Sequence, residues 1–241
     1  QTGRVRTQQD LGLLAIARGR WNEARALLQQ SLASAEQQQM PEEAAVSHRN
    51  LAELELLQGH LGAAIERAGK AEALFKQRED PRGQADAALL RVQALLAMYA
   101  DADAASALDA LQPVLAQASI EQRAIAASLR TQLAQRRGDD HQAQQSLAEA
   151  TRLAAASGVQ ALQMQVALLS PSAGSMRKLD AGTAALGHVA LRLGWLEAAM
   201  TQALARGDGN AAVSAYRDAQ VLLRAGEFGR AAQLHALGAR A

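Results

Sequence analysis

Histidine, cysteine and serine side chains supply many metal ligands and nucleophiles in proteins, and their spacing in this chain supports neither use. No two of the five histidines lie three or four residues apart, the spacing that places two ligands on one helix face. No G-x-S-x-G sequence surrounds a serine, and the chain has no cysteine. We therefore expect no metal site, no cofactor and no enzymatic activity. The histidines are His48, His60, His141, His188 and His235.

The sequence also lacks the patterns of nucleotide and nucleic-acid binding. Neither G-x-G-x-x-G nor G-x-x-x-x-G-K-[ST] occurs, so no phosphate-binding loop is expected. The net charge is +1, from 25 basic and 24 acidic residues, whereas a nucleic-acid surface needs a basic excess. The charged run at 136–141 is typical of a helix end carrying cations, followed by an aspartate that caps the next helix. No apolar run approaches the length needed to span a bilayer.

The composition favours closely packed helices. Apolar residues make up 49% of the chain and aromatic residues only 2%, so the apolar side chains are mostly small or aliphatic and let helices approach closely. Only four prolines interrupt the 241 residues, which leaves long stretches of good helix formers. A chain without cysteine fits the cytoplasm and the periplasm alike. We expect the cytoplasm first, and the periplasm if the full protein carries a membrane span.

One stretch of the sequence repeats itself forty residues later. A fixed offset of this size indicates stacked helical hairpins, each of which cannot bury its apolar face alone. The residues that recur as the same type are Leu11 and Leu51, Leu14 and Leu54, Gly19 and Gly59, Ala24 and Ala64, Ala33 and Ala73, Pro41 and Pro81, and Ala45 and Ala85.

The turn residues predict where the first helices begin and end. A helix is expected over 4–18, and Gly19 should end it. Trp21 should pack in the turn and Asn22 should cap the second helix, which runs to about residue 38. Pro41 should open the third helix in its first turn, where the missing N–H is harmless. Gly59 and Pro81 should repeat these roles.

The period weakens toward the C-terminus. The third unit has no turn glycine at Tyr99, and we expect Asp103 to cap its second helix and Pro113 to interrupt that helix. Helices are expected over 121–137 and 141–157, then a helix of about ten residues, a loop at 170–175, and helix over 178–206 with a break near Gly194. Turns are expected at 207–212 and 226–231. This gives about thirteen helices in all. Those over 1–157 form four hairpins, and the degenerate helices over 158–241 continue the same solenoid.

The segment LGLLAIARGRWNEARALLQQSL resembles the tetratricopeptide repeat. Gly12 and Ala52 match the family's small residue on the first helix, and Ala24 and Ala64 match the small residue on the second. The forty-residue spacing and the run NLAELELLQG resemble the repeats of bacterial signalling proteins, such as regulators of the LuxR/MalT type, winged-helix sensors and Ser/Thr kinases. The resemblance implies an all-α, right-handed solenoid.

In that family the first helix of each hairpin lines the concave face, and the matching positions are the candidate binding residues. An asparagine at the position of Asn50 often holds the backbone of an extended peptide, because its amide offers donors and an acceptor. Arg6 and Arg49 would suit a carboxylate by bidentate contact. The full set is Arg6, Gln9, Asp10, Leu13, Arg49, Asn50, Glu53, Gln93, Gln132 and Gln135.

Two functions follow from this resemblance. The first is a sensing module that binds a peptide, a protein segment or a small inducer in the groove and acts on an output domain in the same polypeptide. The second is a scaffold without a ligand that forms a homodimer through exposed apolar residues of the C-terminal helices. Because the chain starts at Gln1 and ends inside a helical pattern, we expect it to be part of a larger protein. The residues of the second hypothesis are Leu222, Leu223, Phe228 and Leu234, with Trp195 as a further contact.

Overall fold

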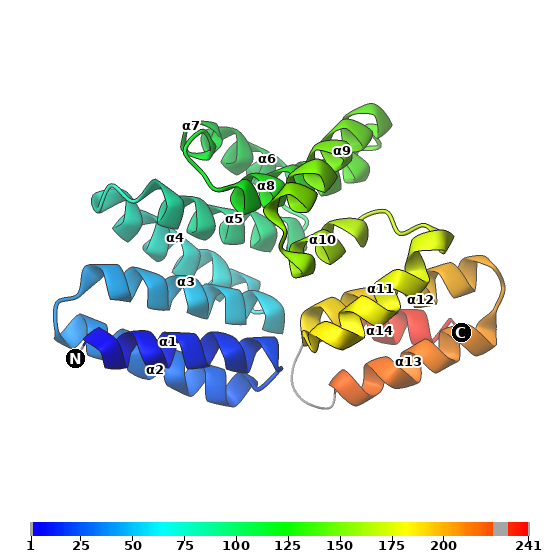
Figure 1. The fold of residues 1–241 in the computed structure, drawn as a ribbon, viewed down its shortest axis with the longest axis horizontal. Coiled ribbons are helices and arrows are strands. Elements are labelled where there is room, and N and C mark those ends of the chain that lie inside the picture. The colour runs from blue at the N-terminus through cyan, green and yellow to red at the C-terminus, as the bar shows by residue number, and fades with distance from the viewer. Residues whose placement is uncertain (1, 224–230, 241) are drawn as a thin grey trace.

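The computed structural model describes residues 2–223 and 231–240, and these form fourteen helices and no strand (Figure 1). The number exceeds the expected thirteen because the second helix of the third unit is divided into α6 and the short α7. The helices are α1 (Thr2–Ala17), α2 (Trp21–Gln37), α3 (Pro41–Gln58), α4 (Leu61–Gln77), α5 (Pro81–Ala97), α6 (Asp101–Ala110), α7 (Gln112–Leu115), α8 (Ile120–Arg137), α9 (Asp140–Ser157), α10 (Gln160–Ala167), α11 (Ala173–Leu186), α12 (Val189–Ala205), α13 (Gly209–Leu223) and α14 (Ala231–Gly238).

Consecutive helices pair as hairpins and the hairpins stack, as the repeat predicted. α1 packs on α2, α3 on α4 and α8 on α9, and each hairpin also contacts the next. The first helices of the hairpins contact one another in sequence, α1 with α3, α3 with α5, and α5 with α8 (Figure 1). We call these four helices the first-helix row. The fold is the predicted all-α stack of helical hairpins.

Several helix boundaries are those expected from the sequence. Pro41 and Pro81 occupy the first turns of α3 and α5, and Gly59 and Gly138 end α3 and α8 in the left-handed conformation. Pro113 interrupts the third unit as predicted, because α6 stops at Ala110 and only the short α7 follows.

The predicted side-chain caps at Asn22 and Asp103 are wrong. Both residues lie inside their helices, and the preceding residues that flank α2 and α6 make no side-chain cap. Side-chain caps occur at other positions, among them Asp80, whose Oδ1 accepts hydrogen bonds from the backbone N–H groups of Arg82 and Gly83, and Ser119, which forms a capping box with Gln122.

The missing glycine at Tyr99 does not alter the turn. Tyr99 itself adopts the left-handed conformation, with φ of 60°, as Gly19 (70°) and Gly59 (82°) do at the equivalent positions of the first two units. The Arg136 guanidinium lies 4.7 Å from the centre of the Tyr99 ring, a cation–π contact between successive units. The third unit therefore keeps a regular turn between α5 and α6.

The C-terminal boundaries differ from the prediction. The expected loop at 170–175 is shorter, because α11 begins at Ala173 and Ser172 caps it together with Ser175. The helical region is interrupted at Gly187, whose φ is 61°, and not at Gly194, which lies inside α12. α13 begins at Gly209, within the predicted turn at 207–212. The predicted turn at 226–231 and Phe228 fall outside the described residues, apart from Ala231, where α14 begins.

The largest apolar cluster joins the two ends of the chain. Ala15, Ile16, Trp21, Leu28 and Leu54 belong to it together with residues of α12, α13 and α14. The start of α12 lies beside the α1–α2 turn (Figure 1), and a Cβ added to Gly19 would lie 3.3 Å from Val189 Cγ2. The C-terminal members that are fully or nearly fully buried are Leu193, Leu196, Met200, Ala215, Ala219 and Leu234.

This cluster takes up the described leucines that were expected to form an exposed dimer surface. Leu234 is fully buried, and Leu222 and Leu223 are half-buried against the same cluster. Trp21 is buried in the turn region, as predicted, and Trp195 is half-buried rather than exposed. Among the described helices, none combines the length and the apolar character that a bilayer crossing requires.

Candidate functional site

Three of the predicted site residues lie together on α3, in the middle of the first-helix row. Arg49, Asn50 and Glu53 fall within about one helical turn, so their side chains are neighbours. Asn50 is fully buried, whereas Arg49 and Glu53 are half-buried. Because α3 contacts both α1 and α5, this polar group lies at the centre of the row.

The Asn50 amide is buried without a hydrogen-bond partner. Neither Oδ1 nor Nδ2 is paired within the part of the chain that the structure describes. A buried polar group left unpaired costs about 1–3 kcal/mol of stability. The equivalent residue one period later is Leu90, so the repeat accepts an apolar side chain at this position. The fold itself therefore does not require an amide here.

The Glu53 carboxyl is destabilised in its charged form. Burial raises its pKa above the ordinary glutamate value, the Arg49 guanidinium opposes that rise, and the Asp86 carboxylate of α5 adds to it. The charged Glu53 is therefore only partly compensated inside the protein. A cationic group of a ligand would compensate it further.

Replacing Glu53 with Gln should stabilise the protein at about pH 7 and give no gain at about pH 4. Because the pKa of Glu53 is raised on folding, the folded state binds its proton more tightly than the unfolded state. The stability that this proton provides is complete below the unfolded pKa and disappears as the pH rises through the folded pKa. Urea unfolding at both pH values measures the effect, with the exposed Glu149→Gln as the control. An equal gain at both pH values would contradict it.

The predicted residues of α1 differ in whether their side chains are buried and bonded within the protein or exposed. The Gln9 amide is buried and donates hydrogen bonds to the Glu43 carbonyl oxygen, at 2.9 Å, and to Ser47 Oγ, at 3.0 Å. Arg6 forms an ion pair of 2.7 Å with Glu43, yet 60% of its side chain stays exposed. Asp10 is exposed. Gln9 thus holds α1 against α3, while Arg6 and Asp10 remain accessible.

Two of the predicted glutamines, one on α5 and one on α8, have amides without a hydrogen-bond partner among the described residues. Gln93 and Gln132 are half-buried and form no hydrogen bond among the described residues. Gln135 is exposed and donates a hydrogen bond of 3.3 Å to the Leu169 carbonyl oxygen. The row thus carries unpaired amides on α3, α5 and α8, of which the α3 amide, that of Asn50, is fully buried.

Sequence reasoning missed Asp86 and Gln122, which belong to the same row. Gln122 Nε2 donates to Asp86 Oδ1 at 2.7 Å and to the Arg82 carbonyl oxygen at 2.8 Å, so it joins α8 to α5. Asp86 lies two repeat periods after Arg6. The position between them in the repeat is Val46, so the offset gave no signal for a charged residue here.

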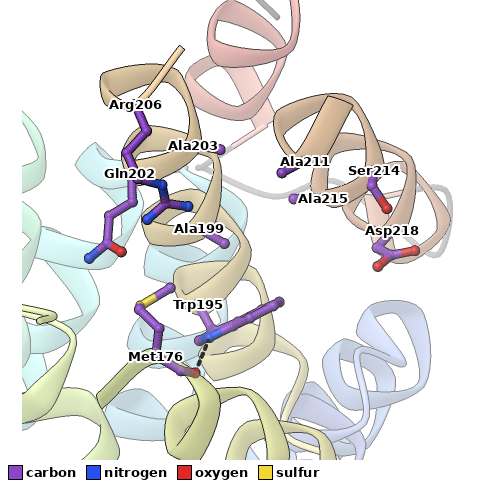
Figure 2. Close-up of a pocket in the computed structure, with 10 residues that line it drawn as sticks. All are labelled: Met176, Trp195, Ala199, Gln202, Ala203, Arg206, Ala211, Ser214, Ala215 and Asp218. Carbon is purple, nitrogen blue, oxygen red and sulfur yellow. Dashed lines mark hydrogen bonds between the residues drawn. The ribbon is translucent and has the colours of Figure 1, made fainter. Parts of the chain in front are cut away.

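A separate depression of about 390 Å³ lies between α12 and α13. Figure 2 shows Trp195 and Met176 at one end of it, and alanines of α12 facing alanines of α13. The sequence singled out Trp195 as a contact residue but gave no sign of the depression, because its two walls come together only through tertiary packing. Among the described residues, no three histidine or acidic side chains come together as a metal site requires.

Comparison with known proteins bears on the N-terminal helices. Residues 4–77, which extend from α1 to the end of α4, match the family model described as Tetratricopeptide repeat. No curated protein matches the chain. Repeats of this family generally mediate protein–protein interaction and are typically non-catalytic. The first two hairpins of this chain are therefore tetratricopeptide repeats, set in an all-helical solenoid of the same type.

Proposed function

We propose that the chain is a non-catalytic interaction and sensing module of a larger bacterial signalling or regulatory protein. It binds an extended peptide or protein segment along the first-helix row and passes the result to an output domain in the same polypeptide. A small inducer bound to the same row is the competing ligand for this surface. The scaffold alternative lacks support, because Leu222, Leu223 and Leu234 are engaged within the chain.

The unpaired Asn50 amide carries this proposal. The protein retains a buried amide that costs stability and has no partner among the described residues. A peptide unit has one N–H donor and one C=O acceptor, which match the acceptor and donor of an asparagine amide. The flanking Arg49 and Glu53 are half-buried, so their movement gives a bound segment access to the amide.

The neighbouring charges suit a peptide with charged groups of both signs. Arg6 and Arg49 match a carboxylate of the segment, and Glu53, with its raised pKa, matches a lysine or arginine. A segment that prefers one curvature of the stack shifts the population toward that curvature. The ligand thereby changes the position of the ends of the solenoid relative to each other. This movement acts on an attached output domain.

Asn50→Leu tests the proposal, because leucine is the residue that the next repeat carries at this position. The substitution should raise the free energy of unfolding by about 1–3 kcal/mol, since it removes an unpaired buried amide. It should also weaken the binding of a peptide selected against the wild-type chain by about tenfold or more. Calorimetric titration measures the affinity, and the exposed Asn22→Leu is the control. Unchanged peptide affinity would overturn the proposal, and selection that yields only small molecules would assign the row to an inducer.

A further inference from the structure

The depression between α12 and α13 is separate from the first-helix row and shares no residue with it. It is an open depression of the surface with a volume of about 390 Å³. It is lined by residues of α11, α12 and α13 (Figure 2). Any ligand held here is therefore distinct from the peptide proposed for the row.

The end of the depression formed by Trp195 is held in place by several contacts. Trp195 Nε1 donates a hydrogen bond of 3.2 Å to the Met176 carbonyl oxygen. The Arg192 guanidinium lies 4.2 Å from the centre of the indole ring, and Arg192 is itself paired with Asp180. The indole therefore offers a fixed apolar surface, which lowers the entropy lost when a ligand binds.

The walls are made mostly of small apolar side chains, with one hydroxyl group from Ser214 of α13. Ala199 and Ala203 of α12 face Ala211 and Ala215 of α13 across the depression (Figure 2). Methyl groups on both walls leave space next to Trp195 and offer no hydrogen-bond partner. This part of the depression fits one large apolar group.

The rim carries one cation and one anion that the protein does not use. Arg206 on α12 and Asp218 on α13 both line the depression, and neither forms an ion pair or a side-chain hydrogen bond among the described residues. They also do not pair with each other. Gln202, by contrast, is occupied, because its Nε2 donates a hydrogen bond of 2.7 Å to the Pro171 carbonyl oxygen.

We propose that this depression binds a small zwitterion with an apolar side chain, namely a free amino acid or a dipeptide. Its carboxylate pairs with Arg206 in a bidentate contact, and its ammonium group pairs with Asp218. Its side chain lies against Trp195 between the two alanine walls. The two charges on separate helices select molecules that carry both a free amino and a free carboxyl terminus.

The test uses L-leucine, L-phenylalanine and leucyl-phenylalanine as probes, titrated calorimetrically into the chain. At least one should bind in about the millimolar range or tighter. Blocking the carboxyl group as an amide, or the amino group by acetylation, should weaken binding about tenfold or more. Arg206→Gln should weaken binding of the probe with a free carboxyl group and leave binding of the amide unchanged. Asp218→Asn should weaken binding of the probe with a free amino group and leave binding of the acetylated probe unchanged.

Matched variants separate this site from general effects of charge and folding. Arg217→Gln, next to Asp218 in the sequence, and Asp109→Asn change exposed charges that do not line the depression and should leave binding unchanged. Ala211→Leu fills the depression from an exposed position of α13 and should abolish binding while the helical circular dichroism is retained. The proposal is wrong if none of the three probes binds, or if Arg206→Gln and Asp218→Asn leave binding of the free probe unchanged.

Discussion

Replacing Leu193 with Asp should lower the melting temperature of the first hairpin together with that of α12. Leu193 is fully buried in the cluster that joins residues 15–54 to α12, α13 and α14. It lies one turn after Val189, which contacts the α1–α2 turn at Gly19. A carboxylate here would be buried without a partner, and we expect a loss of about 4 kcal/mol or more. For a chain of this size such a loss corresponds to a fall in melting temperature of about 10 °C.

The chain contains two tryptophans, one at each end of this cluster, which allows the two ends to be followed separately. In a Trp195→Phe background, Trp21 reports only on the first hairpin. Leu193→Asp should shift the Trp21 transition downward, although the two residues lie at opposite ends of the sequence. The control is Val221→Asp, which places the same charge at a side chain that is 67% exposed and should have little effect. An unchanged Trp21 transition would show that the two ends unfold independently.

The contact between the ends also connects stability to the proposed sensing. Gly19 and Val189 belong to the first and last parts of the stack, so a change in curvature along α1, α3, α5 and α8 alters their separation. A segment bound along the row therefore competes with, or reinforces, the apolar contact at the ends. The free energy of that contact limits how far a ligand can shift the curvature.

Local signals in the sequence predicted the helices well where one residue decides the boundary. Pro41, Pro81 and Gly59 act through their own backbone restrictions, and these do not depend on tertiary packing. The local sequence does not show that Gly187 ends a helix whereas Gly194 lies inside one. α12 continues through Gly194 because the apolar residues on either side, such as Leu193 and Leu196, are buried against distant helices. That burial offsets the cost of about 1 kcal/mol of a glycine inside a helix.

The candidate site was predictable in position but not in environment. The resemblance to the tetratricopeptide repeat assigned Arg49, Asn50 and Glu53 to the first helix of the second hairpin, and they lie on that helix, α3. The sequence could not show that Asn50 is fully buried or that Gln9 is bonded to Glu43 and Ser47, because both depend on how α1 and α3 pack. The contact between the chain ends was invisible for the same reason, since a period describes neighbouring units and not the two ends.

A second large effect is expected in the first hairpin, where Gly12 of α1 meets Leu28 of α2. A Cβ added to Gly12 would lie 2.7 Å from Leu28 Cγ and Cδ2, and Leu28 is fully buried. Leu28→Ala should therefore cost about 2–5 kcal/mol, through lost apolar burial and the cavity left behind. Gly12→Ala should cost about 1–3 kcal/mol, because the buried leucine has little room to move.

The sign of Gly12→Ala should reverse when Leu28 is already Ala. Without the leucine the new methyl group has space, and alanine gains about 1 kcal/mol over glycine in a helix interior. Gly69→Ala in α4 is the control, since nothing lies within 4 Å of its added Cβ and it should stabilise both backgrounds equally. Urea unfolding of the four variants of the cycle gives the coupling between the two positions.

The second repeat unit naturally carries the pair of alanines that the double substitution would create in the first. Gly12 and Leu28 correspond to Ala52 and Ala68, which are both fully buried in the second unit. One hairpin thus pairs the smallest residue with a large one, and the next pairs two alanines. Because the first pair contains more side-chain volume than the second, the Gly12→Ala and Leu28→Ala double variant should remain less stable than the wild type. A Gly12→Ala effect of the same sign and size in both backgrounds would mean that Leu28 does not limit the approach of α1 to α2.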